Sequence, residues 1–256
     1  MIILTLVTQV GGFIWICVFG VFKFRFQSIS RLRKILAFLI IYLVITLLLV
    51  PQLAKLNNRV ALPVFKSGNL IPHNLITPLL NRHYVRPKLK RELIKISDKV
   101  NSHIANLKIS YLDANFPFVD GFPLLPHLSH NDGRKIDLCF YYKLNSRAGI
   151  LKPSNSGYGK YVEPKPKEPN YNSICKSKGY WQYDFTKHLT LGSRQDLEFD
   201  LSNTRYLVSQ IVNNPFTQKL LIEPHLKDRM KLTHDKVRFQ GCHAVRHDDH
   251  IHYQIN

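Results

Sequence analysis

The sequence predicts an α+β fold, in which a small antiparallel sheet with flanking helices is preceded by a two-helix transmembrane hairpin. Two long apolar stretches near the N-terminus predict the hairpin. After them, helical and short strand patterns are mixed without the regular strand–helix–strand order of a parallel sheet, which favours α+β. The 256 residues are enough for one domain of ordinary size together with an anchor.

The two apolar stretches are long enough to be membrane spans. Residues 1–22 contain no charged side chain, and residues 35–50 are almost wholly Leu, Ile, Val, Ala and Phe. Each stretch approaches the roughly 20 residues that cross a hydrocarbon core. Neither has a polar face, which disfavours a pair of buried core helices. We therefore expect spans at about 2–22 and 35–53, and a hairpin over residues 1–53.

The charge of the chain is strongly basic and unevenly distributed. Lys and Arg total 36 against 17 acidic residues, which gives a formal net charge of +19 at pH 7. No acidic residue occurs before Glu92, so most of the excess belongs to the apolar N-terminal third. A soluble nucleic-acid-binding protein places its basic patch on the folded domain instead. We therefore expect a membrane, and no nucleic acid, among the partners.

The basic residues also predict an orientation. Residues 23–34, between the expected spans, carry five basic side chains and no acidic one. The positive-inside rule places this loop in the cytoplasm and both chain ends on the opposite side. Three basic residues also follow the second span, namely Lys55, Arg59 and Lys66, and they reduce the difference in positive charge between its two sides. Residues 54–91 are basic and contain four prolines, and we expect a juxtamembrane linker there.

Residues 92–256 are expected to form the single folded domain. The apolar spacing within residues 88–108 predicts a helix. Two shorter helices are expected at 204–212 and 224–232. Strands are expected at 107–112, 135–143, 220–222 and 250–255. Residues 144–180 are rich in Asn, Ser, Gly, Pro and Lys, and predict a long loop or insertion.

Histidine is concentrated in two short windows of this domain. Of the 12 histidines, six fall within residues 127–130 and 243–252. The first window opens the stretch His127-Leu-Ser-His130-Asn-Asp-Gly-Arg-Lys-Ile-Asp137, and the second contains His247-Asp-Asp-His250-Ile-His252. Neutral imidazole and carboxylate are common zinc ligands, and a catalytic zinc site uses three of them plus an open water position. The two windows therefore predict a zinc site.

The expected strand at 250–255 constrains this site. In a strand, His250 and His252 lie on the same face, so that one can bind the metal while the other lies beside the metal-bound water. Asp137 can meet His130 across the turn between them. A carboxylate inside an apolar strand is costly unless it is paired with a cation or a metal. The residue types thus supply two nitrogens and one oxygen for the ion.

These two motifs resemble the penicillin-insensitive murein endopeptidases. The resemblance rests on His-x-Ser-His-x-x-Gly-x-x-x-Asp at residues 127–137 and on His-x-x-His-x-His at residues 247–252. That family belongs to the D-Ala-D-Ala metallopeptidases, which share a fold with the hedgehog signalling domain. The resemblance spans about residues 107–256. Dipeptidases and carboxypeptidases of the group typically have glutamate at the place of His247, so histidine favours the endopeptidase branch.

The resemblance implies roles for six residues. The implied zinc ligands are His130, Asp137 and His252. The implied catalytic residues are His247, His250 and, as an accessory residue, His127. His247 is the first candidate for general base, and His250 can stabilise the oxyanion, but the sequence does not separate these two roles.

The resemblance also implies an activity and a location. It implies a zinc metalloendopeptidase that hydrolyses the peptide cross-links of peptidoglycan, and the two apolar stretches add a membrane anchor that departs from the usually soluble members of that branch. We expect it in the bacterial inner membrane, with the C-terminal domain facing the periplasm or the outside. Two alternatives stay open, which are a D-Ala-D-Ala carboxypeptidase of the same fold and a non-catalytic wall-binding module that keeps the metal.

Other reactive residues have simpler interpretations. Cys139 lies two residues beyond Asp137 and is expected to be a small buried hydrophobic residue rather than a ligand. Cys175 and Cys242 can form a disulfide if the domain lies outside the cytoplasm. Glu223 precedes a proline, and an acidic residue at a helix N-terminus explains it more simply than a catalytic base.

Overall fold

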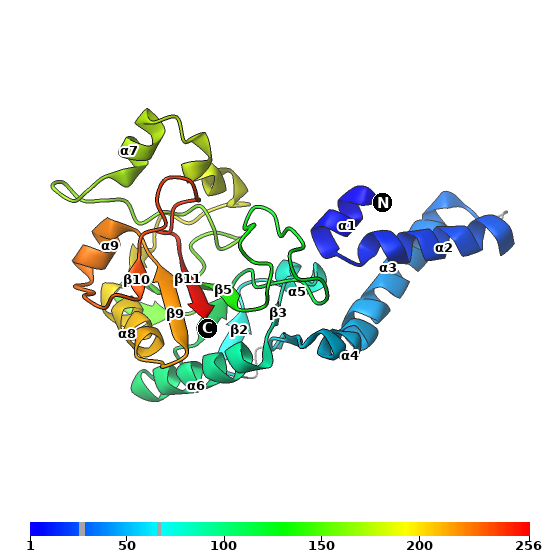
Figure 1. Cartoon of the computed structure of the whole chain (residues 1–256), viewed down its shortest axis with the longest axis horizontal. Coiled ribbons are helices and arrows are strands. Elements are labelled where there is room, and N and C mark those ends of the chain that lie inside the picture. The colour runs from blue at the N-terminus through cyan, green and yellow to red at the C-terminus, as the bar shows by residue number, and fades with distance from the viewer. Residues whose placement is uncertain (26–28, 66–67) are drawn as a thin grey trace. The chain divides into compact units, whose positions relative to one another are not determined.

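The computed structural model describes residues 1–25, 29–65 and 68–256 (Figure 1). Residues 26–28 of the expected basic loop and residues 66–67 of the expected linker lie outside the described residues. The chain divides into two compact units, each assembled from separate stretches of sequence. The first unit comprises Met1–Leu62, Leu75–Lys90 and Asp113–Lys135. The second unit comprises Pro63–Asn74, Arg91–Leu112 and Ile136–Asn256.

The first expected span is not a single helix. Helix α1 covers Ile2–Thr8 and helix α2 covers Gly11–Arg25. The two helices are separated at Gln9, whose backbone has a left-handed conformation with a φ of 65°. Neither helix alone provides the roughly 20 residues that a span requires.

Two neighbouring features explain the break between α1 and α2. The hydroxyl oxygen of Thr8 accepts a 2.7 Å hydrogen bond from the N–H of Gly11, which satisfies a backbone donor at the start of α2. A Cβ atom at Gly12 would lie 1.9 Å from Oγ1 of Thr5, so only glycine permits this close approach of α1. Gly11 and Gly12 therefore divide the apolar run into two helices.

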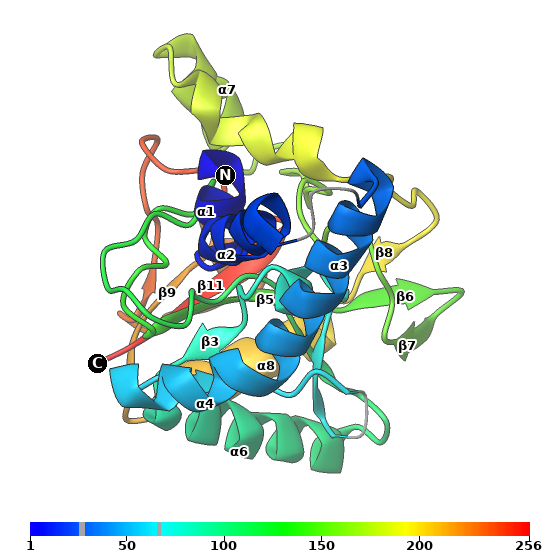
Figure 2. The same ribbon diagram turned by 90° about the vertical axis from the view of Figure 1, so that its right-hand side faces the viewer.

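The second expected span belongs to one long helix. Helix α3 (Arg31–Val44) continues through a π-helical turn, η1 (Ile45–Leu49), into α4 (Val50–Ala54) and η2 (Lys55–Asn57), as Figure 2 shows for α3 and α4. The whole helix, Arg31–Asn57, has 27 residues, and its apolar 18-residue window has a mean hydropathy of 2.6. Among the described residues it alone is long and apolar enough to cross a membrane. The predicted two-span hairpin is therefore wrong, and one candidate span remains.

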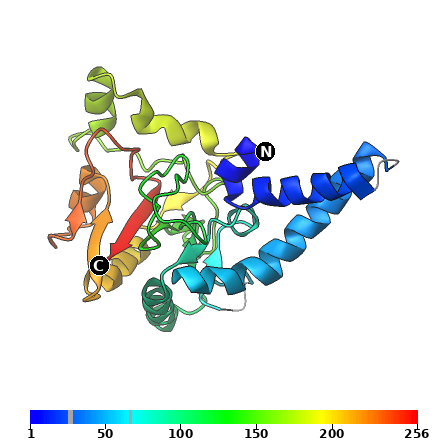
Figure 3. The same cartoon turned by 45° about the vertical axis from the view of Figure 1, so that its right-hand side comes forward.

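Helix α2 packs along α3, as the two blue helices of Figure 3 show. Ile14 and Val18 of α2 are buried against Phe38 of α3. Trp15 and Phe19, one turn apart on α2, stack with their ring centroids 3.7 Å apart. The N-terminal helices therefore have an apolar cluster of their own.

The remaining elements of the first unit are short. They are β1 (Val60–Ala61), α5 (Ile76–Leu79) and β3 (Tyr84–Val85). Strands β1 and β3 pair antiparallel, and Tyr84 is buried against Val50 and Ala54 of the long helix. Segment 54–91, for which the sequence predicts a linker, thus contains ordered strands and a helix.

The second unit is built on a six-stranded sheet with the order β10-β9-β11-β5-β4-β2 (Figure 1). Its strands are β2 (Leu70–Pro72), β4 (Ile109–Tyr111), β5 (Lys135–Cys139), β9 (Thr217–Leu221), β10 (Val237–Arg238) and β11 (His250–Ile255). The α+β class is confirmed. The sheet is mixed rather than antiparallel, because β2 pairs parallel to β4 and β9 pairs parallel to β10. The β2–β4 connection contains two helices, so no simple βαβ rhythm is visible in the sequence.

A smaller antiparallel sheet and several helices complete this unit. The small sheet consists of β6 (Tyr142–Leu144), β7 (Arg147–Gly149) and β8 (Glu198–Phe199). The helices are α6 (Pro87–His103), α7 (Tyr171–Ser177), η3 (Trp181–Leu189), α8 (Leu201–Val212) and α9 (Pro224–Arg229). Helices α6, α8 and α9 correspond to the three predicted from the sequence.

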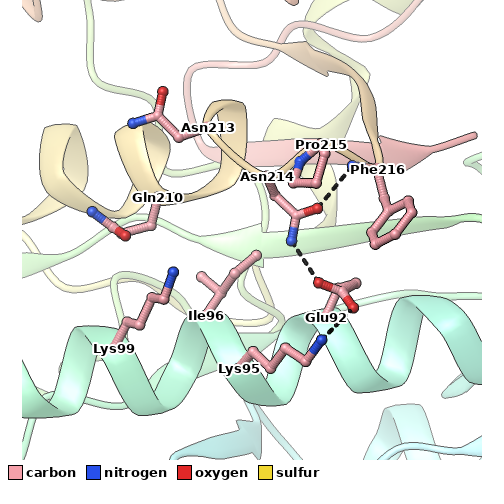
Figure 4. Close-up of a pocket in the computed structure, with 9 residues that line it drawn as sticks. All are labelled: Glu92, Lys95, Ile96, Lys99, Gln210, Asn213, Asn214, Pro215 and Phe216. Atoms are coloured by element: carbon pink, nitrogen blue, oxygen red, sulfur yellow. Dashed lines mark hydrogen bonds and ion pairs between the residues drawn. The ribbon is translucent and has the colours of Figure 1, made fainter.

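Glu92 joins α6 to the turn that follows α8 (Figure 4). Its carboxylate accepts hydrogen bonds from the amide of Asn214 at 2.8 Å and from Lys95 at 3.0 Å. A pocket of about 280 Å³ lies between these two elements. Its lining residues include none of the predicted site residues, so this pocket is not the candidate site.

Candidate metal centre

Asp137 and the histidines of the last strand meet in the centre of the six-stranded sheet. Strand β5, which carries Asp137, is the neighbour of β11, which carries His250 and His252. Nδ1 of His252 lies 3.0 Å from Oδ1 of Asp137. Nε2 of His250 lies 3.7 Å from Oδ2 of the same carboxylate. One fully buried carboxylate therefore contacts both histidines, which the period of a strand places on one face.

The two histidines of the first window are also buried. Nδ1 of His130 lies 2.7 Å from the carbonyl oxygen of Ala114. A carbonyl oxygen only accepts, so Nδ1 carries the hydrogen and Nε2 keeps the lone pair that a metal ion requires. The rings of His127 and His130 lie 5.5 Å apart. The backbone of the first unit thus sets the tautomer of His130 in the form suited to a ligand.

Two groups of three buried side chains have ligand atoms within 4.8 Å of one another. The groups are His130, Asp137 and His252, and His127, Asp137 and His250. Either group offers two imidazole nitrogens and one carboxylate oxygen, a donor set suited to zinc. Two ligands of a tetrahedral zinc ion lie about 3.3 Å apart, and the 3.0 Å between His252 and Asp137 is close to that separation. The residues present therefore fit a divalent metal ion.

Tyr158 is a contact of this site that the sequence did not predict. Its hydroxyl donates a 2.9 Å hydrogen bond to Oδ2 of Asp137. The ring of Tyr158 also packs edge-on against His250, with 5.1 Å between the centroids. Tyr158 belongs to the expected loop 144–180, where no periodicity or motif marks a site residue. The only local signal is the Gly-Tyr-Gly sequence, whose two glycines both have positive φ.

Asp249 is the partner of the His250 ring nitrogen that does not face Asp137. The carboxylate of Asp249 is hydrogen-bonded to Nδ1 of His250, and it accepts a 2.6 Å hydrogen bond from the N–H of Gly159. Burial lowers the pKa of His250, but the carboxylates of Asp249 and Asp137 raise it to about 9 overall. Without a bound cation, His250 is therefore protonated near neutral pH.

Glu223 holds the backbone of His247 in the turn that precedes β11. Oε1 of Glu223 accepts a 3.0 Å hydrogen bond from the N–H of His247, and the N–H of Glu223 donates to the carbonyl oxygen of His247 at 3.1 Å. The second oxygen of Glu223 accepts a hydrogen bond from Tyr183. The ring of His247 lies 5.0 Å from that of His250 and 5.8 Å from that of His252. Glu223 begins α9, as predicted, and also fixes the backbone of a predicted site residue.

A buried ion pair supports the turn that precedes β11. Arg246 is hydrogen-bonded through two nitrogens to Asp248 and lies over the ring of Tyr161, 4.0 Å from its centroid. Burial lowers the pKa of Arg246, but Asp248 and Glu163 raise it well above its ordinary value overall. Contacts of Arg246 with Asp248, Tyr161 and Glu163 tie this turn to the loop that carries Tyr158.

The cysteines fall into two classes. Cys175 and Cys242 form a disulfide, the pairing for which the sequence allowed. Cys139 is buried, with its sulfur 3.2 Å from Nδ1 of His73, and burial raises the pKa of its thiol to about 12. Cys139 belongs to neither group of possible metal ligands, which agrees with its interpretation as a small buried side chain.

The six predicted site residues are all buried. Within the second unit, Asp137 contacts His250 and His252, and the ring of His247 lies beside both of these histidines. Tyr158, Asp249 and Glu223 are additional residues of the site. No protein-family model and no curated protein matches the chain. The chemistry of these residues therefore carries the functional argument.

Proposed function

We propose that the chain is a membrane-anchored zinc metallopeptidase that hydrolyses the peptide cross-links of peptidoglycan. The single observation that carries the proposal is the buried carboxylate of Asp137, which lies 3.0 Å from His252 and belongs with His130 to one potential ligand set. Removing a carboxylate from water is costly even where histidines and a tyrosine contact it, as they do at Asp137. A divalent cation bound by the three side chains of this ligand set would offset that cost.

We assign the ligands to His130, Asp137 and His252. The hydrogen bond from His130 to the carbonyl oxygen of Ala114 and the hydrogen bond from Tyr158 to Asp137 support this assignment. Such outer hydrogen bonds are typical of metal ligands, because they fix the tautomer and the orientation of the ligand. Zinc held by these three residues would polarise a water molecule and lower its pKa towards 7.

His247 and His250 are the candidates for proton transfer and charge stabilisation. The pair with Asp249 holds the ring of His250 and keeps a hydrogen on Nδ1, so that its other nitrogen faces the carboxylate of Asp137. This arrangement suits a group that stabilises negative charge on the substrate oxygen. His247 has its backbone held by Glu223 and its ring beside both other histidines, which suits a general base.

Two further features support a substrate outside the cytoplasm. The Cys175–Cys242 disulfide is typical of proteins outside the reducing cytoplasm. The apolar helix Arg31–Asn57 is long enough to anchor the chain in a membrane. Together with the motif resemblance, these features support a bacterial inner-membrane protein whose second unit faces the periplasm or the outside.

A digest of purified cross-linked muropeptides tests this proposal. The full chain in detergent micelles, loaded with zinc, is incubated with cross-linked dimers, and the products are identified by mass. Conversion of dimers to monomers, abolished by a chelator and restored by zinc, is the expected result. Release of terminal D-Ala from intact dimers would indicate the carboxypeptidase instead. Zinc binding and retention of wall material without any cleavage would indicate the binding module.

A further inference from the structure

Arg59 lies directly after the long apolar helix and is buried. The helix ends at Asn57, and Asn58 takes a left-handed conformation with a φ of 53°. The N–H of Arg59 then donates to the carbonyl oxygen of Ala54 at 3.0 Å, which closes the helix end. The Arg59 side chain is only 1% exposed. A cation beside a membrane span ordinarily remains in water or in the headgroup region, so the burial of this one requires specific partners.

Among the described residues, the hydrogen-bond partners of the Arg59 side chain lie in the segment that carries the first histidine window. Its guanidinium donates to the carboxylate of Asp120 and, at 3.3 Å, to the carbonyl oxygen of Phe116. Gly133 lies directly against the guanidinium, because a Cβ atom built there would be 2.7 Å from Nε of Arg59. With a φ of 78°, Gly133 also has a backbone conformation that favours glycine. The guanidinium thus contacts both ends of the loop 116–133.

Arg86 contacts the same loop. Its backbone N–H donates to the carbonyl oxygen of Gly133 at 2.7 Å, and its Nε donates to that of Asp132 at 2.9 Å. Its Nη2 lies 2.6 Å from the second carboxylate oxygen of Asp120. Asp120 is therefore shared by two guanidinium groups, which explains how an aspartate with 56% of its side chain exposed can hold a buried arginine.

His130 lies three residues before Gly133 and is held from the same backbone. Its Nδ1 is hydrogen-bonded to the carbonyl oxygen of Ala114. The side-chain oxygen of the neighbouring Asn115 accepts a hydrogen bond from the N–H of Gly133 at 2.9 Å. Asn115 also exchanges two backbone hydrogen bonds with Tyr84, which is itself buried against the long helix. The end of the helix is therefore connected to the histidine loop by an ionic contact and by an apolar one.

We propose that Arg59 is a positioning residue, which joins the end of the membrane helix to the loop of His127 and His130 and so holds a zinc ligand in place. The proposal rests on the metal centre proposed above. It also means that the helix Arg31–Asn57 is part of the structure that forms the site, and not only an anchor. Because the loop is fixed by a guanidinium, a change at this contact alters metal affinity without removing a ligand.

Zinc affinity of the full chain in detergent micelles tests this role, measured by competition with a chromophoric chelator at pH 7. Arg59→Met is expected to weaken zinc binding by about 10-fold, the effect typical of groups that orient a ligand. Arg59→Lys should restore part of the loss, since lysine keeps the charge but not the planar fork. Asp120→Asn should also weaken binding, and the double variant should lose less than the sum of the two single losses, because both changes break the contact between Arg59 and Asp120.

Two control variants separate positioning from general effects. Lys55→Met removes an exposed cation at the same helix end, whose amine contacts only Gln52 among the described hydrogen bonds, and should leave zinc affinity unchanged. Leu62→Ala creates a cavity at a buried residue of the same unit. It should lower the thermal midpoint but keep the zinc affinity of the folded protein.

Wild-type zinc affinity in folded Arg59→Met and Asp120→Asn would overturn the positioning role. An equal loss of affinity in Leu62→Ala would also overturn it, because the effect would then reflect stability alone. If Arg59→Met does not fold, Asp120→Asn decides by itself. A wild-type chain that binds no zinc would contradict the metal centre, and the role of Arg59 would fall with it.

Discussion

The hydroxyl of Tyr158 donates a 2.9 Å hydrogen bond to Oδ2 of Asp137, which joins a long loop to the central strand of the sheet. The other oxygen of the same carboxylate faces His252. A carboxylate that binds a metal through one oxygen is commonly held through the other by a neutral donor. Tyr158 therefore has the position of a residue that orients a ligand.

The Tyr158→Phe variant removes this hydrogen bond and keeps the ring. We expect zinc affinity to fall by about 10-fold, the effect typical of an outer hydrogen bond. The chelator competition described above measures it. Tyr171→Phe is a matched control, because Tyr171 lies on α7 and its ring packs against Phe239. Equal affinities for the Tyr158 variant and the wild type would show that the hydroxyl does not orient Asp137.

The His247→Ala variant separates catalysis from metal binding. His247 is outside both potential ligand groups, so the variant should keep its zinc. Loss of a general base typically reduces turnover by about 100-fold or more. Parallel measurement of zinc content and of muropeptide cleavage checks both expectations. Unchanged turnover would exclude His247 as the base, and loss of zinc would make it a ligand instead.

Gly159→Ala should strongly destabilise the loop beside the site. Gly159 has a φ of 78°, and a Cβ atom there would lie 2.2 Å from the carbonyl oxygen of Thr186. The left-handed conformation alone costs alanine about 1 kcal/mol, and the clash adds about 1–3 kcal/mol. Gly179 has a similar φ of 84° but open space around its Cβ position. Gly179→Ala should therefore show the smaller loss in thermal unfolding, and equal losses would mean that the clash is relieved.

The stability of the chain should fall as the pH drops below about 6.5. Burial lowers the pKa of His83 from 6.5 to about 3, with a smaller effect of Lys90 in the same direction. The unfolded chain therefore takes up a proton between these pH values and the folded chain does not, so the free energy of unfolding decreases with falling pH. At pH 5 the expected loss from this one group is about 2 kcal/mol.

The His83→Phe variant tests this assignment. Denaturant unfolding at pH 7.5 and pH 5, with a chelator present to keep metal out, should show a smaller pH-dependent loss in the variant than in the wild type. Identical losses would mean that other groups cause the acid sensitivity.

The elements whose apolar residues recur with a local periodicity could be predicted from the sequence. Strand β11 occupies the six residues His250–Ile255 expected from the sequence, because its apolar and aromatic residues continue to the chain end. Helices α6, α8 and α9 follow from apolar spacing and from a proline at the first turn. The pairing of β2 with β4 was not predictable, since β2 lies within a segment whose prolines resemble a linker.

The burial of Arg59 could not be predicted either. In the sequence Arg59 is one of three cations after an apolar stretch, which is typical of a membrane flank. Its partner Asp120 is 61 residues away, and the space for its guanidinium depends on Gly133. The break between α1 and α2 had a local signal, because Gln9 and the glycine pair after it interrupt the first apolar run. Tyr158 had only the Gly-Tyr-Gly sequence as a local signal, since its contact with Asp137 arises only in the folded chain.

The zinc content of the purified full chain tests the central claim most directly. We predict about one zinc ion per chain after equilibration and removal of excess metal, and none above background in His252→Ala, which lacks one of the three ligands. His243→Ala, which changes a histidine outside both ligand groups, should keep the metal. A wild-type chain without bound zinc, or a His252→Ala variant with its full complement, would contradict the proposed centre.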